Sequence, residues 1–151
     1  MKKIFLLLLF IPLVFSACKK ENEVDKFVGT YALTCNGSVS IYLTGEEVTV
    51  PLDASGVYLY ITPRQGSNTV DVSGYYNSLG FVTGDMLRMD PESVTDFTDG
   101  IQTTMTFDHQ PAVLAGTMMS WQTNVTMRMT DAFGNTLTGT GTIQNVANKR
   151  Y

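Results

Sequence analysis

The stretch IQTTMTF at residues 101–107 alternates strictly between two sets of side chains. One set contains the apolar residues Ile101, Met105 and Phe107, together with Thr103. The other set contains only glutamine and threonine. A period of two belongs to a β-strand, whose successive side chains point to opposite faces. The stretch therefore predicts a strand with one face in a core and the other in water.

The same alternation recurs along the rest of the chain, where Gly, Asn, Asp and Ser separate the runs as turn residues do. Short connections favour antiparallel neighbours. The best candidate for a helical turn is Asp90–Asp96, with Pro91 at the first helical position. The predicted strands are residues 27–35, 38–44, 47–52, 57–63, 69–76, 81–89, 101–107, 115–130 and 136–147.

A chain with this many antiparallel strands must protect the edges of its sheet, either by closing into a barrel or by packing two sheets face to face. The strand at residues 115–130 is long enough to serve both sides of a closed structure. Gly116, Gly139 and Gly141 can permit the kinks that closure needs. We expect an all-β fold, a single antiparallel meander of eight or nine strands closing into a barrel, with a β-sandwich as the alternative.

The N-terminal residues have the composition of a secretory signal. Two lysines give a basic start, and residues 4–15 form an apolar run that only Pro12 interrupts. This run is shorter than the roughly 20 apolar residues that a membrane-spanning helix needs. Residues 1–17 are therefore expected to be a signal peptide.

The end of this segment, Ser16-Ala17-Cys18, resembles the bacterial lipobox. In that family a diacylglyceryl group is attached to the cysteine sulfur, and a dedicated peptidase cuts before the cysteine. The resemblance implies that Cys18 is the lipid attachment site and the first residue of the mature protein. Phe15 departs from the motif, which usually carries an aliphatic residue there. The alternative is an ordinary signal peptide that leaves Cys18 as a free thiol.

Residues 18–26 are expected to form the lipidated cysteine and a polar tether, followed by the barrel domain at residues 27–151. The run Lys19–Glu23 resembles the short Lys-then-acid surface-export signal of lipoproteins in Gram-negative gut and oral anaerobes. Asn22 stands where that signal prefers a second acid. The resemblance implies a lipid-anchored protein of the outer membrane, exposed at the cell surface. The alternative is a plain solvated tether, which does not indicate on which face of the outer membrane the protein lies.

The charge of the chain bears on its partners. The full sequence has a formal charge of −4, and loss of Lys2 and Lys3 with the signal peptide lowers it to −6. An acidic surface argues against nucleic acid as a partner. The length of the mature chain suits one domain with a substantial core.

The segment that enters the domain, DKFVGTY at residues 25–31, resembles the first strand of lipocalin-like (calycin) domains. Those domains carry a Gly-x-aromatic pattern in which the aromatic ring closes the barrel floor, and Gly29 and Tyr31 match it. Tyr31 replaces the more familiar tryptophan. The family also places a basic residue near the last strand over this ring, a position that Lys149 or Arg150 can supply, with Arg150 assigned to the floor here.

Several aromatic residues are candidates for lining a ligand cavity, because aromatic side chains dominate apolar pockets. The residues assigned to this role are Tyr58, Tyr60, Tyr76 and Trp121. Each of them can equally be a core residue or a member of a cross-strand pair on the outer face.

Few residues point to other chemistry. Cys35 has no disulfide partner once Cys18 is lipidated, and a free cysteine is usually a small buried hydrophobe. His109 has no Cys or His companions and is expected to be exposed at a strand end. The acidic residues around 90–108 match no full calcium loop, and no Gly-x-Ser-x-Gly, phosphate-loop or Cys-x-x-Cys motif occurs. We expect no enzyme, no cofactor and no metal site.

Two functions follow from these expectations. The first is a membrane-anchored lipoprotein whose barrel binds a small apolar or amphipathic ligand. The alternative is a structural or interaction subunit of an envelope complex, with a barrel filled by its own side chains and no ligand. An open interior lined by Tyr and Met would favour the first, and a filled interior would favour the second.

Overall fold

The computed structural model describes residues 22–151, which form eleven β-strands and contain no helix. The predicted signal peptide, Cys18 and the start of the tether lie outside the described residues. Within the described part, no helix has the length and apolar character needed to cross a bilayer. The strands are β1 (Gly29–Leu43), β2 (Glu46–Pro51), β3 (Ala54–Pro63), β4 (Thr69–Gly74), β5 (Ser78–Thr83), β6 (Met86–Met89), β7 (Glu92–Thr98), β8 (Ile101–His109), β9 (Ala112–Ala115), β10 (Met118–Thr130) and β11 (Thr136–Arg150).

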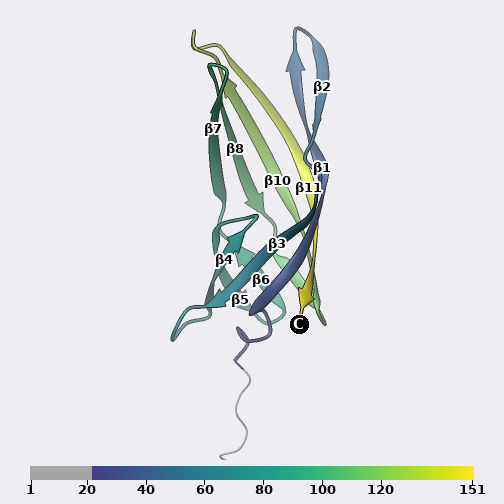
Figure 1. The fold of residues 1–151 in the computed structure, drawn as a ribbon, viewed down its shortest axis with the longest axis vertical. Helices are drawn as coiled ribbons and strands as arrows, with labels where there is room; N and C mark the ends of the chain where they lie inside the picture. Colours follow the sequence, from purple (N-terminus) through teal and green to yellow (C-terminus); the bar gives the residue numbers. More distant parts are fainter. Residues whose placement is uncertain (1–21) are drawn as a thin grey trace, which may run out of the picture.

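Eight of these strands close into an antiparallel barrel, which confirms the predicted fold class and excludes the sandwich. The ring of pairings runs β1-β3-β4-β5-β6-β9-β10-β11 and returns to β1. β2 and the β7–β8 hairpin are additions to this meander, because β2 pairs with β1 and β8 pairs with β10 outside the ring. The short strands β3 to β6 lie at the lower end of the molecule in Figure 1.

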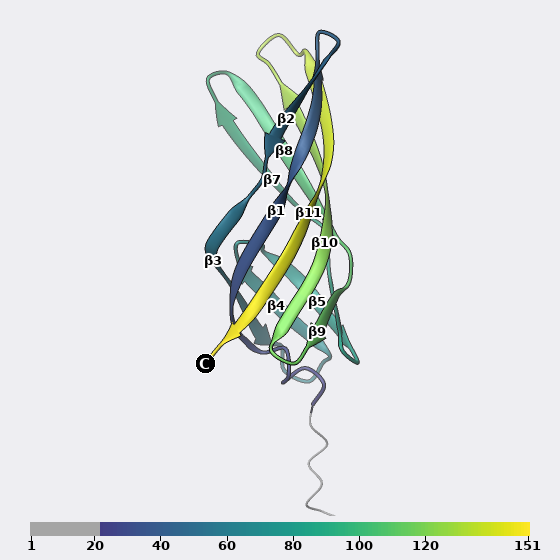
Figure 2. The same cartoon turned by 90° about the vertical axis from the view of Figure 1, so that its right-hand side faces the viewer.

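The three longest strands of the ring, β1, β10 and β11, extend past the closed part into a second region. There they are flanked by the added strands, in the order β2-β1-β11-β10-β8-β7. We call this region the upper sheet; it comprises residues 36–53, 92–108 and 122–144. Figure 2 shows these long strands continuing from the barrel into the upper sheet as one twisted surface.

Glycines permit the tight approach of β1 to β11 where the upper sheet begins. A Cβ atom on Gly141 would lie 1.8 Å from the carbonyl oxygen of Ser38, and one on Gly37 would lie 2.1 Å from the carbonyl oxygen of Thr142. Real side chains cannot occupy such space. Gly37 of β1 and Gly141 of β11 are therefore needed for the close approach of the two strands.

The interior of the closed barrel is occupied by side chains, and every strand of the ring contributes at least one. β1, β10 and β11 supply larger residues such as Tyr31, Trp121 and Ile143, while the short strands supply mainly Leu, Val and Met. An eight-stranded barrel is just wide enough for side chains to fill or for one small ligand. The buried side chains of the ring strands are Tyr31, Leu33, Cys35, Leu59, Ile61, Val70, Val72, Val82, Leu87, Met89, Ala112, Met119, Trp121, Thr123, Ile143, Asn145 and Ala147, with Val39, Ile41, Val125 and Met127 farther along in the upper sheet.

The lower end of the barrel is covered by residues just before β1. Val24 and Phe27 are fully buried there, although residues 18–26 were expected to form a tether. A Glu23 carboxylate oxygen accepts a hydrogen bond from the Gly84 amide at 3.2 Å, and Lys26 forms an ion pair with Asp85. The folded part of the chain therefore includes residues 23–26.

Several predicted strand limits were wrong. β1 continues through Asn36-Gly37, which resembles a hairpin turn in sequence but is paired with β11 throughout. The predicted strand at residues 81–89 is the β5–β6 hairpin, and Gly116 lies in the turn before β10 with a φ of 64°.

The segment Asp90–Asp96 forms most of β7 rather than a helical turn, because it pairs with β8 across the Asp99-Gly100 turn. Both turn residues have positive φ, 53° and 79°, as a two-residue hairpin turn requires.

Candidate functional site

The most polar part of the interior lies at the upper end of the closed barrel, around Tyr76. The Tyr76 hydroxyl donates a hydrogen bond to Oδ1 of Asn145 at 2.9 Å, and Nδ2 of Asn145 donates to Oγ1 of Thr123 at 2.9 Å. Thr123 Oγ1 is also 2.9 Å from Nδ1 of His109. Cys35 Sγ lies 4.0 Å from the Tyr76 hydroxyl. We call these five residues the Tyr76 network.

The Tyr76 ring also packs between aromatic neighbours. Its centroid lies 4.6 Å from the ring of His109, 5.8 Å from Phe107 and 6.2 Å from Trp121, all in edge-on arrangements. Such edge-to-face contacts stabilise aromatic pairs beyond the area that they bury. Tyr76 therefore joins the connection after β4 to the inner faces of β1, β8, β10 and β11, where the barrel opens into the upper sheet.

The environment keeps the titratable groups of the network uncharged. Burial raises the pKa of the Cys35 thiol to about 11, and it also raises the pKa of the Tyr76 phenol. Burial lowers the pKa of His109 to about 4, against a smaller opposing effect of Asp108. A neutral thiol is a poor nucleophile. The network therefore has the character of a buried structural cluster, and Cys35 is buried as expected.

Nε2 of His109, a member of this network, and Nε1 of the adjacent Trp121 have no hydrogen-bond partner among residues 22–151. Both side chains are only 5% exposed. An unpaired buried polar group costs about 1–3 kcal/mol. The expectation that His109 is exposed was wrong, because Tyr76 and the strands beside it cover the imidazole.

The four aromatic residues assigned to a ligand cavity lie in two separate places. Tyr76 and Trp121 are inside the barrel, with ring centroids 6.2 Å apart. Tyr58 and Tyr60 lie on the outer face of β3, stacked with a centroid distance of 6.4 Å, and each remains nearly half exposed. The alternation of β3 causes this separation, since Leu59 and Ile61 take the inward positions.

Gly29, Tyr31 and Lys149 lie together at the lower end of the barrel. The Lys149 ammonium lies 5.9 Å from the centroid of the Tyr31 ring and donates a hydrogen bond to the carbonyl oxygen of Lys26 at 3.1 Å. A Cβ on Gly29 would lie 2.8 Å from Cε of Lys149, so the glycine leaves room for the lysine chain. Arg150 is the wrong basic residue for this role, because it pairs with Thr30 and is exposed.

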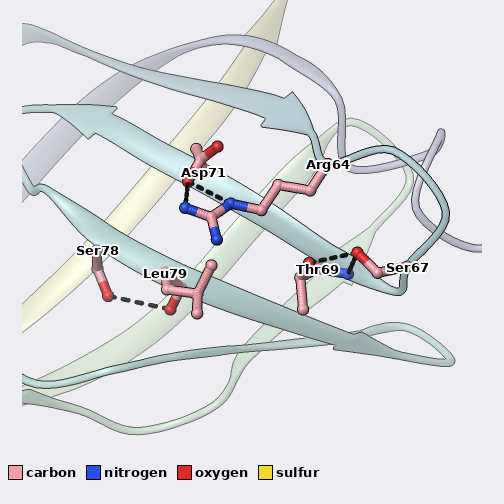
Figure 3. Close-up of polar contacts among 6 residues, drawn as sticks. All are labelled: Arg64, Ser67, Thr69, Asp71, Ser78 and Leu79. Atoms are coloured by element: carbon pink, nitrogen blue, oxygen red, sulfur yellow. Dashed lines mark hydrogen bonds and ion pairs between the residues drawn. The ribbon is translucent and has the colours of Figure 1, made fainter.

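Other polar contacts hold loops on the surface. Figure 3 shows the ion pair of Arg64 with Asp71 across the β3–β4 hairpin, in which two guanidinium nitrogens approach Oδ1 of Asp71 at 2.8 and 2.7 Å. The hydrogen bond from Arg64 lowers the pKa of the Asp71 carboxyl. Within residues 22–151, no three His, Cys, Asp or Glu side chains are grouped so that they could hold a metal ion.

The inner face of the upper sheet is the second candidate site. Its strand register produces an apolar row that crosses all six strands and is interrupted only by a glycine. The members of the row, in cross-strand order, are Val48, Ile41, Gly139, Met127, Met105 and Val94. Ile41 and Met127 in the centre are buried, whereas Val48 and Val94 on the edge strands are 40% and 56% exposed.

A small hollow lies at the far end of this face. It has a volume of about 90 Å³ and is lined by Ile101, Met129 and Leu137, with Asp131 and Asn135 from the adjoining loop. Pockets for drug-sized ligands have volumes of about 300–1,000 Å³. The hollow therefore has room for a single side chain at most.

Thr123 and Asn145 were missed by the sequence reasoning, although a signal was available. In the strand predicted at residues 136–147, the inward positions Leu137 to Ile143 continue through Asn145 and Ala147, and then to Lys149. A polar residue at an inward position of a strand indicates a buried partner. The same continuation would have selected Lys149 over Arg150 for the floor.

No family model matches the sequence, and no curated protein matches it. Among solved structures, the chain is similar to a multidomain protein including DUF1735 from Bacteroides ovatus, with 12% identity and a TM-score of 0.32, over 80% of this chain and 48% of that chain. It is also similar to a structural-genomics protein of unknown function from Bacteroides ovatus, with 12% identity and a TM-score of 0.29, over 80% of this chain and 47% of that chain. The chain spans about half the length of either solved chain.

Proposed function

We propose that this chain is a lipid-anchored lipoprotein of the outer membrane whose barrel is a non-enzymatic interaction module. Its outer surface and its upper sheet would bind another envelope protein. The module could lie on either face of the outer membrane. The observation that carries the proposal is the set of large side chains inside the barrel: Tyr31, Tyr76 and Trp121 are all buried there. A filled interior is the feature that separates an interaction subunit from a ligand carrier.

The lipid anchor is part of the same proposal. Ser16-Ala17-Cys18 resembles a lipobox, and the described domain begins a few residues later at the barrel floor. Two or more acyl chains hold a protein stably on a bilayer. We expect Cys18→Ala to move the protein from the membrane fraction to the soluble fraction, and a variant that stays fully membrane-bound would contradict the anchor.

A lipocalin-like relationship is proposed on the geometry of the floor. The cation of Lys149 over the Tyr31 ring, next to Gly29, supports the resemblance found in the sequence. Cation–π contacts of this kind contribute about 0.5–1 kcal/mol at exposed sites. The relationship concerns architecture, and it is compatible with a barrel that holds no ligand.

Binding of a small apolar or amphipathic ligand inside the barrel is the second candidate function. One observation favours it: two buried atoms, Nε2 of His109 within the Tyr76 network and Nε1 of the neighbouring Trp121, have no hydrogen-bond partner among the described residues. A ligand with hydrogen-bonding groups could pair with both atoms. It would have to displace side chains that now fill the interior.

Tryptophan fluorescence separates the two functions, because Trp121 is the single tryptophan of the chain and lies inside the barrel. The mature chain carrying Cys18→Ala would be titrated with a series of long-chain fatty acids. We expect the Trp121 emission to stay unchanged. A saturable change in emission would overturn the interaction module in favour of a ligand carrier.

A further inference from the structure

We infer that the β7 edge of the upper sheet binds a cationic, extended polypeptide segment that adds to the sheet as a further strand. This inference rests on the proposed interaction function and names the chemistry of the partner. Three properties of the upper sheet support it: unpaired strand edges, an apolar row whose exposure rises toward those edges, and a strong excess of acidic residues.

The upper sheet ends in two strands that each have one neighbour. β7 pairs with β8 and β2 pairs with β1, and the described residues provide no further strand beside either. In Figure 1 these two strands lie on opposite sides of the upper end. A strand edge presents unpaired N–H and C=O groups, which are a template for another extended chain.

The exposure of the apolar row shows where a covering strand would fit. Exposure along this row rises from 4% at Met127 in the centre to 56% at Val94 on β7. On the outer face of the same strand Phe97 is 70% exposed. A strand added to β7 would place side chains against both residues, because cross-strand neighbours stand about 4.5–5.5 Å apart.

Of the two edges, β7 is the better template. β2 ends in Pro51, and proline is one of the usual devices that protect an edge. β7 has no proline, is seven residues long and exposes the larger apolar side chains. It is held against β8 by side-chain pairs such as Ser93–Thr106 at 2.9 Å, so the edge is presented by an ordered hairpin.

The charge of the upper sheet defines the partner as basic. Its three ranges, 36–53, 92–108 and 122–144, contain eight acidic residues and one basic residue, Arg128. The other described residues contain five acidic and five basic side chains, so they are neutral overall. The eight acidic residues are Glu46, Glu47, Asp53, Glu92, Asp96, Asp99, Asp108 and Asp131.

The pattern along β7 refines this chemistry. Glu92 and Asp96 flank Val94 on the inner face, because all three share that face with Phe107, Thr103 and Met105 of β8. A matching strand would therefore alternate basic and apolar residues on the same face. A second copy of this chain would instead place like charges opposite one another, which disfavours pairing of β7 with itself.

Peptide binding tests the inference with matched probes. The mature chain carrying Cys18→Ala would be titrated calorimetrically with a ten-residue peptide alternating Lys and Val, with the same peptide carrying a central proline, and with one alternating Glu and Val. We expect only the uninterrupted Lys-Val peptide to bind. We also expect amide hydrogens of residues 92–98 to gain protection from exchange when it does.

Two charge reversals locate the site on one edge. Asp96→Lys is expected to weaken peptide binding about tenfold or more, whereas Glu47→Lys on β2, with the same change of net charge, should alter it by about twofold or less. If Glu47→Lys is the damaging variant, or if the proline-containing peptide binds equally well, the β7 inference is wrong.

Other outcomes would also overturn it. If none of the peptides binds, the inference that β7 binds a cationic strand is wrong. The proposed interaction function is tested separately, by the Trp121 fluorescence titration. Protection of residues 92–98 that rises with protein concentration, without any peptide, would assign the edge to a second copy of the chain.

Discussion

The Tyr76 hydroxyl donates a hydrogen bond to Oδ1 of Asn145 across the barrel interior, at 2.9 Å, between residues 69 positions apart in the chain. This contact ties the connection after β4 to the inner face of β11. It also marks the level at which the closed barrel ends and the upper sheet begins. The stability of the fold should depend on it.

Removing the Tyr76 hydroxyl is expected to destabilise the protein. Tyr76→Phe keeps the ring and leaves Oδ1 of buried Asn145 without its donor, which should lower the free energy of unfolding by about 1–3 kcal/mol. Tyr60→Phe is the matched control, because the Tyr60 side chain lies on the outer face and should change stability by less than about 0.5 kcal/mol. Urea denaturation measures both, and equal effects would refute the role of the hydrogen bond.

The buried His109 predicts a pH dependence of stability. Its pKa is about 4 in the folded chain, against about 6.5 in an unfolded one. Between these values the unfolded chain binds a proton that the folded chain does not, so the free energy of unfolding should fall by about 3 kcal/mol as the pH falls from 6.5 to 4.

Two measurements check this dependence. His109→Asn retains a polar atom near Thr123 but cannot titrate in this range, so its unfolding should lack this component of the pH dependence. NMR titration of the imidazole gives the pKa directly. A value near 6.5 in the folded protein would contradict the burial of His109.

The close approach of β11 to β1 predicts that Gly141 tolerates no side chain. Gly141→Ala would place a methyl group where the Ser38 carbonyl oxygen lies, and the strands would have to separate. We expect a loss of about 3 kcal/mol, at the upper end of overpacking effects. Thr140→Ala, the outward neighbour, is the control and should cost less than about 0.5 kcal/mol by thermal unfolding. A harmless Gly141→Ala would show that the close approach does not require a glycine.

The barrel floor predicts different roles for two neighbouring basic residues. Lys149→Met removes the cation over Tyr31 and the hydrogen bond to the Lys26 carbonyl oxygen, and it should cost about 1–2 kcal/mol. Arg150→Met should be nearly neutral, because Arg150 is exposed on the outer face. Chemical denaturation of the two variants compares them, and a larger effect at Arg150 would reverse the assignment.

Much of the fold could be predicted from the sequence because alternation is a local signal. The period of two predicted an all-β barrel and most of its strands, although it merged β5 with β6 and missed β7 and β9. The alternation was less informative where the same dipeptide is compatible with both a turn and a continuous strand. Asn36-Gly37 has the composition of a turn, yet Gly37 is needed for the close approach of β11 to β1.

Prediction from the sequence failed most where residues distant in the chain determine the local structure or the burial of a side chain. The acids and Pro91 at the start of β7 resemble a helix start, but pairing with the threonine-rich β8 makes the segment a strand. Burial of His109 depends on Tyr76, which lies 33 positions earlier in the chain. The separation of Tyr58 and Tyr60 from Tyr76 and Trp121 required knowledge of which face of β3 turns inward.

Native mass spectrometry of the mature protein, extracted from its own host in a mild detergent, tests most directly the claim that the barrel is filled and acts through its surface. We expect the mass of the polypeptide and its covalent lipid, with no small molecule of constant mass retained. A retained molecule that leaves only when the protein unfolds would contradict the claim and identify the barrel as a ligand carrier.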